Sequence, residues 1–319
     1  MTSAPILGEI RTDLAMETHQ FVAGIRGPSV PGVESYTEEK GKTKVTRVII
    51  QTPEAGQALG KKPGYYVTVE SPALRGRDKD DLEEVAQEIA AELRTFIAGF
   101  NLNDEASCLV VGLGNWNATP DALGPKVVEK ILVTRHLFES TPPEKRGGLR
   151  PVCAVSPGVL GITGIETKEI VAGIVQRVKP AFILVIDALA SRSTERMGST
   201  VQIANTGINP GSGVGNRRLG LTTESLGVPV IAVGVPTVVQ ARTIIHDALE
   251  QITSLGGPST KAFRKEVIDR VLSSYFQDLI VTPKEIDVLI DDISRALAGA
   301  INIALHPGVT AEEVFRYLE

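Results

Sequence analysis

From Cys108 onward, short apolar runs alternate with segments whose apolar residues recur every three or four positions. The runs are CLVVGL at 108–113, PVCAVSP at 151–157, FILVIDAL at 182–189 and PVIAVGV at 229–235. Such runs are typical of strands buried on both faces, and helical segments between them are typical of βαβ units. We therefore predict an α/β fold with a mainly parallel sheet that helices cover on both faces.

The rest of the chain carries weaker patterns. β-Branched runs at 44–52 and 64–71 predict neighbouring strands in a small antiparallel sheet, peripheral to the main core. Apolar residues three and four apart over 79–100 predict one amphipathic helix. We expect peripheral strands and a helix in 20–107, the central sheet in 108–252, and C-terminal helices in 261–319, with two helices over 261–303, the second beginning near Thr282-Pro283.

Charge and hydropathy argue against several protein classes. The net charge is -5, from 33 basic and 38 acidic residues, whereas nucleic-acid binders usually carry a strong basic excess. No apolar stretch approaches the roughly 18 to 20 residues that span a bilayer, and the first residues lack the pattern of a signal peptide. We expect a cytoplasmic protein that contacts neither nucleic acid nor membrane directly.

Two aspartates follow the predicted strands. Gly112 and Gly114 allow a tight turn after the first run, Asp121 starts the next helix, and Asp187 comes after five apolar residues. The carboxyl ends of parallel strands meet at one edge of the sheet, where two carboxyls could share a proton, activate water and protonate a leaving amine. Asp121 could equally cap a helix, and Asp187 could accept bonds from the backbone amides that follow it.

The segment NPGSGVGN at 209–216 lacks the Lys and the Ser/Thr of a phosphate-binding loop. We favour a loop that contacts a peptide or stabilises an oxyanion through Gly211, Ser212 and Gly213, over a plain turn. The four histidines contain no i, i+4 pair, which excludes a zinc site of the H-E-x-x-H type. No serine or cysteine nucleophile motif is present, and we predict no metal and no cofactor.

The chain resembles the spore germination protease family over essentially its whole length, and several specific segments carry the resemblance. They are RTDLAMET at 11–18, EASCLVVGLGN at 105–115, TPDALGPKVV at 119–128, TRHLFE at 134–139, PGVLGITGIET at 157–167, IDALASRSTER at 186–196, NPGSGVGN at 209–216 and VTPKEIDVLIDDI at 281–293. The core is also similar to the hydrogenase maturation endopeptidases, whose Gly-Asn, acidic, Ala-x-Gly turn matches Gly114, Asn115, Asp121, Ala122 and Gly124, and whose second acidic ligand matches Asp187. The histidine that completes the nickel site in those relatives has no counterpart here.

The resemblance implies an endopeptidase that degrades small, acid-soluble spore proteins during germination. It also implies a zymogen, a homotetramer and a location in the cytoplasm of the forespore or spore core. Asp121 and Asp187 become the catalytic pair, acting by general acid–base hydrolysis without a covalent intermediate.

The start of the chain matches the substrates of the family it resembles. Those substrates are cut between an acidic and an apolar residue, in the pattern acidic, apolar, Ala, variable, Glu. Asp13-Leu14-Ala15-Met16-Glu17 fits this pattern. We predict self-processing between Asp13 and Leu14, which makes 1–13 a propeptide and 14–319 a single α/β peptidase domain. Asp13 could also cap a short helix, and the two readings are compatible.

A substrate with acidic residues on both sides of the cut needs cationic partners. Arg192 and Arg196, which follow the third run, and Arg217, which follows the glycine-rich segment, are the candidates. Each could instead be a solvated surface side chain. Two other functions stay open: a metal-dependent peptidase or amidase that uses the same aspartates as ligands, and a peptide-binding module without catalysis.

Overall fold

The computed structural model describes residues 12–26, 30–209, 220–255, 263, 266–267, 270–272 and 279–318. Within these residues the strands form one sheet in the order β1-β2-β3-β7-β8-β6-β4-β5, with β9 paired to β8. The strands are β1 (Val33–Lys40), β2 (Thr43–Ile50), β3 (Gly64–Glu70), β4 (Cys108–Gly112), β5 (Val152–Val155), β6 (Phe182–Ser191), β7 (Thr200–Ala204), β8 (Val230–Gln240) and β9 (Ile280–Val281).

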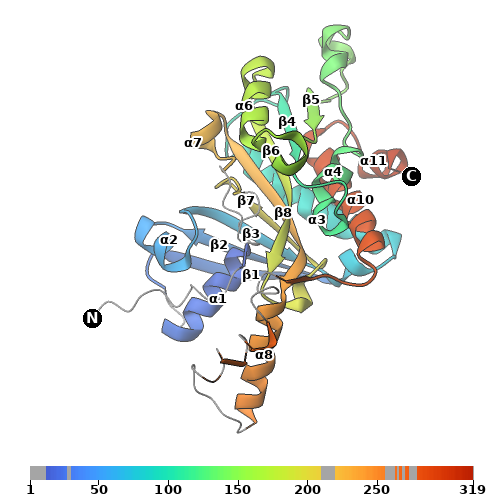
Figure 1. Ribbon diagram of the computed structural model, residues 1–319. Helices are drawn as coiled ribbons and strands as arrows, with labels where there is room; N and C mark the ends of the chain where they lie inside the picture. Colours follow the sequence, from blue (N-terminus) through green and yellow to red (C-terminus); the bar gives the residue numbers. More distant parts are fainter. Residues whose placement is uncertain are drawn as a thin grey trace.

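The main helices lie on both sides of this sheet (Figure 1). They are α1 (Ala15–Arg26), α2 (Pro53–Leu59), α3 (Lys79–Ala98), α4 (Leu123–Val128), α5 (Leu160–Thr163), α6 (Thr167–Val178), α7 (Thr223–Leu226), α8 (Ala241–Ser254), α10 (Ile286–Leu305) and α11 (Ala311–Tyr317). None of the helices in the described part of the chain is long and apolar enough to cross a membrane.

The four apolar runs form the parallel part of the sheet. They are β4, β5, β6 and β8, and β4 pairs in parallel with β5 and β6, as β6 does with β8. The predicted α/β fold, with parallel strands at its centre and helices on both faces, is confirmed. Beyond β8 the sheet turns antiparallel, because β7 runs against both β8 and β3. The predicted strands β2 and β3 pair antiparallel, but they continue the central sheet instead of forming a small sheet of their own.

Strand alternation divides the apolar side chains between two faces. Val110, Leu184 and Val233 belong to the core that packs against α3, α4 and α10. Leu109 and Ile183 face the other way, toward α6. On that second face, α1 and α2 cover the far end of the sheet over β2 and β3. On this second face, α6 on one side and α1 with α2 on the other therefore flank the middle of the sheet.

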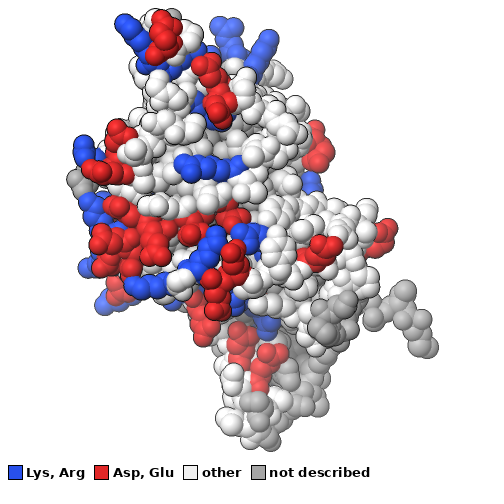
Figure 2. Space-filling model, turned by 180° about the vertical axis from the view of Figure 1, so that it is seen from behind, with Lys and Arg blue, Asp and Glu red and all other residues white. Residues whose placement is uncertain are grey.

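Helix α3 confirms the helix predicted from spacing, since Val85, Ile89, Leu93 and Phe96 are all buried. Its outer side carries acidic residues that pair with the β1–β2 hairpin, as in the ion pair of Lys42 with Asp81 at 2.8 Å. Figure 2 shows acidic and basic side chains intermixed across the middle of one face of the molecule. Of the two helices predicted over 261–303, the second is α10, and most of the first lies outside the described residues.

Candidate active site

The turn after β4 holds Asp121 against the backbone. Gly114 has a φ of 123°, and a Cβ atom there would lie 1.9 Å from the carbonyl oxygen of Asp121. The Asn115 amide donates to that carbonyl at 3.1 Å and to Oδ2 of Asp121 at 3.0 Å. Asp121 ends a short 3₁₀ helix, η3 (Thr119–Asp121), and is partly buried. Only glycine permits this approach, so the sequence around Gly114 fixes where the carboxylate lies.

Asp187 lies in β6 and is 6% exposed. The amide of Ala188 donates to its Oδ1 at 2.9 Å, which is the backbone contact that the sequence left open as an alternative role. The prediction that Asp187 ends its strand is wrong, because β6 and β8 continue together to Ser191 and Gln240. The strand that ends beside Asp187 is β4, because its last paired residue, Gly112, lies opposite Ile186.

The structure brings Asp121 and Asp187 to the same part of the sheet. The amide of Leu113, at the start of the turn that leads to Asp121, donates to the carbonyl of Ile186 at 2.8 Å. The helix η3 that carries Asp121 contacts both β6 and β8. The two segments that carry these aspartates are thus neighbours where β4 stops, at the carboxyl end of the parallel strands.

The segment that matches the cleavage pattern lies against β6. The Asp13 amide donates to the carbonyl of Ala190 at 3.0 Å, and the Ala190 amide donates to Oδ2 of Asp13 at 2.9 Å. Leu14, Ala15 and Met16 are at most 1% exposed. The chain around the predicted cut is therefore a fully packed part of the structure, and α1 begins directly after it, at Ala15.

Glu17, the last residue of the pattern, is 3% exposed and has several donors. Its carboxylate accepts from the amides of Arg192 at 2.8 Å and Ser193 at 3.1 Å, and from Nη1 of Arg196 at 3.0 Å. The Thr12 hydroxyl donates to it as well. The structure therefore surrounds one acidic side chain with backbone amides and a guanidinium, a recognition geometry for a carboxylate.

The two predicted arginines differ in what they contact. Arg196 reaches Glu17 through its guanidinium, whereas Arg192 reaches it only through its backbone amide. The Arg192 guanidinium lies instead 3.4 Å from Asp247 and 3.7 Å from Glu250 on α8. Arg217, Gly211, Ser212 and Gly213 lie outside the described residues.

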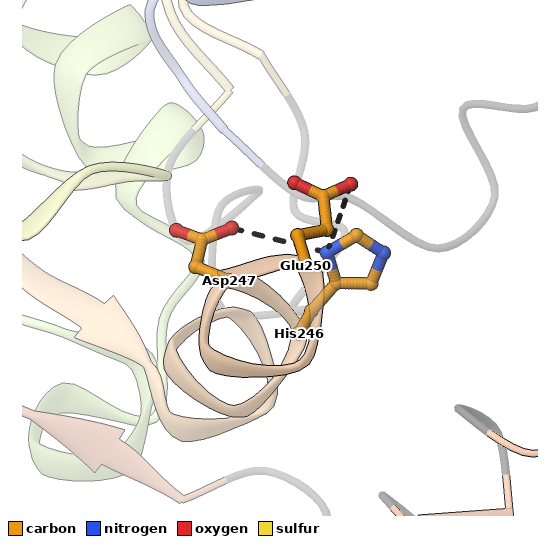
Figure 3. Close-up of side chains that lie close together, drawn as sticks. All are labelled: His246, Asp247 and Glu250. Carbon is orange, nitrogen blue, oxygen red and sulfur yellow. Dashed lines mark ion pairs between the residues drawn. The ribbon is translucent and has the colours of Figure 1, made fainter. Parts of the chain in front are cut away.

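Within the described part of the chain, three potential metal ligands come together on α8, namely His246, Asp247 and Glu250 (Figure 3). Nδ1 of His246 lies 3.8 Å from Asp247 and 3.7 Å from Glu250. Burial raises the pKa of Asp247. Because the guanidinium of Arg192 already faces both carboxylates, it would repel a divalent cation there. The arrangement fits an anchor for Arg192 better than a metal centre.

A cavity of about 590 Å³ opens beside the predicted cut. It is lined by the segment that carries Asp13, by the loop after α2, and by β6, β7 and β8. Asn209, the first residue of the glycine-rich segment, also lines it. The cavity has the position and the size to hold part of a peptide.

Reasoning from the sequence missed two residues that contact the predicted cut, Lys61 and Gln202. Nζ of Lys61 lies 2.7 Å from the carbonyl oxygen of Asp13, and Nε2 of Gln202 lies 3.0 Å from the same atom. Lys61 occurs in GQALGKK and Gln202 in STVQIAN, segments whose local pattern carries no signal of chemistry. Only the fold brings them to Asp13.

Comparisons with known proteins agree on one family. A family model described as germination protease matches residues 12–262 and 250–318. A germination protease of Caldanaerobacter subterraneus subsp. tengcongensis is 49% identical, over 98% of this chain and 99% of that protein. Those of Clostridium tetani and Bacillus subtilis are 45% and 41% identical, each over 97% of this chain and over 99% and 96% of their own lengths.

Among solved structures, a [NiFe] hydrogenase maturation protease, HycI of Thermococcus kodakarensis, covers 66% of this chain and 98% of its own. The sequence identity is 17% and the TM-score is 0.32, a likeness too weak to support an argument about function.

Proposed function

Because this chain belongs to the germination protease family and is therefore a peptidase, we propose that it is an endopeptidase of small, acid-soluble spore proteins, made as a zymogen that cuts itself between Asp13 and Leu14. The observation that carries the proposal is the way residues 13–17 are bound. Both acidic side chains of the pattern have dedicated donors, and the three residues between them are buried. This is how a peptidase would hold its own recognition sequence.

The proposed catalytic groups are Asp121 and Asp187. The proposal requires the two carboxyls to approach closely enough to share one proton, with one carboxyl ionised and the other protonated, since two negative charges at short range repel. The ionised carboxylate takes a proton from water as the water oxygen attacks the carbonyl carbon, and the protonated carboxyl gives its proton to the leaving nitrogen. No covalent bond to the enzyme forms at any step.

The donors around Glu17 suggest how the acidic residue after the cut is recognised in other substrates. Arg196 and the amides of Arg192 and Ser193 would hold that glutamate as they hold Glu17. We propose further substrate contacts from Arg217 and from Gly211 to Gly213, because the glycine-rich segment begins at the cavity with Asn209.

The experiment compares the parent protein with Asp187→Asn and Asp121→Asn, and uses Asp80→Asn as a control because Asp80 is exposed on α3. Intact mass and the N-terminal residue report self-processing, and a peptide containing Glu-Ile-Ala-Ser-Glu reports cleavage in trans. We expect the parent and the control to expose Leu14 and to cut the peptide after its first Glu. Both site variants should stay intact and inactive, because Asn cannot exchange the proton.

Processing at the parent rate in a folded Asp187→Asn or Asp121→Asn protein would refute the catalytic assignment. A chelator arm tests the metal-dependent alternative: activity that is lost with chelator and restored by a divalent ion would make the aspartates ligands. Binding of the peptide without any product, by protein that already begins at Leu14, would favour the non-catalytic module.

A further inference from the structure

The carbonyl group of Asp13, two residues before the start of α1, is held by side-chain donors. Its oxygen accepts from two side chains that come from separate parts of the chain, Nζ of Lys61 at 2.7 Å and Nε2 of Gln202 at 3.0 Å. This carbonyl belongs to the peptide bond that the proposed processing breaks. Two N–H donors converging on one carbonyl oxygen form the arrangement that stabilises an oxyanion in acyl transfer.

Lys61 is held in place by the turn that ends α2. Gly60 adopts a left-handed conformation with a φ of 61°, and the Lys61 amide donates to the carbonyl of Gly56 at 3.0 Å. The Lys61 side chain is partly buried and also donates to the carbonyl of Thr12 at 3.2 Å. Burial lowers its pKa, while the carboxylates of Asp13 and Glu17 act to raise it. Nζ of Lys61 therefore meets the carbonyl oxygen away from bulk water, where an N–H donor has most effect.

Gln202 contacts the chain on both sides of Leu14. Its Oε1 accepts from the amide of Ala15 at 2.6 Å, and this bond leaves Nε2 as the group that faces the carbonyl of Asp13. One side-chain amide thus fixes the chain one residue before and one residue after Leu14. Such a contact orients the peptide bond between Asp13 and Leu14 as well as donating to it.

The sheet connects this carbonyl to the proposed catalytic pair. Gly234 in β8 lies opposite Gln202 in β7 and opposite Asp187 in β6, so the three residues form one row across the sheet. Strands lie about 4.8 Å apart, which puts the Cα atoms of Gln202 and Asp187 roughly 10 Å from each other. Because side chains alternate along a strand, Asp187 points to the same face of the sheet as Leu189. Leu189 lines the cavity together with Gln202 and Gly234. Gly234 has no side chain of its own, and the side chain of Leu189 packs over it.

We infer that Lys61 and Gln202 bind the oxyanion that forms at the Asp13 carbonyl during self-processing; this inference rests on the proposed function. As water adds to the carbonyl carbon, the carbonyl electron pair moves to the oxygen, whose negative charge the two donors stabilise. The proton from water goes to the aspartate pair. The electron pair on that oxygen then re-forms the C=O double bond, and the bond to the Leu14 nitrogen breaks. The aspartate pair supplies a proton to that nitrogen, which leaves a carboxylate on Asp13 and an amine on Leu14.

The test measures the rate of self-processing in Lys61→Met and Gln202→Leu, which remove the donors but keep most of the side-chain volume. Lys44→Met is the matched control, since Lys44 is exposed on β2. Loss of one oxyanion donor commonly lowers a rate by about 100- to 1000-fold, and we expect a decrease of this order in each variant. Lys61→Arg should recover part of the rate because it restores a charged donor.

A second measurement separates stabilisation of the oxyanion from anchoring of the chain. With protein that begins at Leu14, cleavage of the peptide Glu-Ile-Ala-Ser-Glu should lose kcat in both variants, with little change in KM, because the donors act mainly in the transition state. A higher KM with the parent kcat would make the two residues ordinary binding contacts and overturn the inference.

Parent rates of processing in Lys61→Met and Gln202→Leu, under conditions where Asp187→Asn stays uncut, would also overturn it and leave the proposed function intact. Processing by Asp187→Asn would instead refute the proposed function. Gln202 belongs to a different element, strand β7, so Gln202→Leu decides the question if Lys61→Met does not fold.

Discussion

The contacts of Glu17 lead to a quantitative prediction about stability. In Glu17→Gln the side chain keeps its shape but loses its charge, and one of its two oxygens becomes an NH₂ group. The carboxylate now accepts from two amides, from a guanidinium and from a hydroxyl. An NH₂ group cannot accept from any of them, so at least one donor at this 3% exposed position is left without an acceptor.

The magnitude follows from the number of bonds that change. A hydrogen bond to a charged group contributes about 1.5 to 3 kcal/mol, and an unsatisfied buried donor costs about 1 to 3 kcal/mol. Loss of one partner of a buried ion pair costs about 3 to 5 kcal/mol in total. We therefore expect Glu17→Gln to lower the free energy of unfolding by about 3 kcal/mol. The control Glu70→Gln, at the more exposed partner of Arg196, should lower it by at most about 1 kcal/mol.

The assay is urea unfolding followed by circular dichroism, with every variant made in the Asp187→Asn background so that the chain stays uncut under the proposed mechanism. A double-mutant cycle with Arg196→Met isolates the interaction between the two side chains. A change below about 1 kcal/mol in Glu17→Gln, or an effect equal to that of Glu70→Gln, would refute the argument that the Glu17 carboxylate is a buried, fully bonded charge.

Two further predictions concern other parts of the molecule. Gly114→Ala should slow self-processing by roughly 100-fold, because the added methyl group would displace the Asp121 backbone and a small misplacement of a reacting group can lower a rate by that factor. Intact mass measures the rate. The control is Gly173→Ala, at an open position in α6. The free energy of unfolding should fall as the pH drops below about 6.5. The neutral ring of His306 accepts from the Arg150 amide at Nδ1, and burial lowers the pKa of His306. The unfolded chain therefore binds a proton that the folded chain does not.

Each of these has a result that would contradict it. A folded Gly114→Ala protein that processes as fast as Gly173→Ala would show that the turn tolerates a side chain. For His306, the change in the free energy of unfolding between pH 7.5 and 5.5 is compared between the parent protein and His306→Gln. This comparison separates His306 from His19, whose pKa is also lowered by burial. An unchanged slope in the variant would show that His306 is not the group responsible.

The elements that could be predicted from the sequence are those whose apolar composition reflects their burial. The apolar runs that became β4, β6 and β8 are buried on both faces and the run that became β5 is partly buried, so their composition identifies them. Strand β1 was missed because its sequence, VESYTEEK, is mostly polar and its residues are mostly exposed at the edge of the sheet. It is a strand only because β2 lies beside it along its whole length. No local pattern could report that partner.

The candidate site divides in the same way. Asp121 and Asp187 could be proposed because a carboxylate beside an apolar run is costly without a reason. Lys61 and Gln202 could not, since they lie in polar or mixed segments, and only the tertiary fold brings the loop after α2 and strand β7 to Asp13. Arg192 shows the limit of the reasoning about charge. Arg192 was proposed to bind an acidic residue through its side chain, whereas its backbone amide contacts Glu17 and its guanidinium is directed to α8.

The burial of Leu14, Ala15 and Met16 has a further consequence for the enzyme after the proposed cut. These residues and Glu17 lie on the C-terminal side of that bond, so they remain covalently attached to the protein that made it. A segment tethered at such short range has an effective concentration on the order of millimolar. The first turn of α1 would then act as a built-in competitor, and the access of an incoming peptide would depend on how often that turn detaches as well as on the peptide's own affinity.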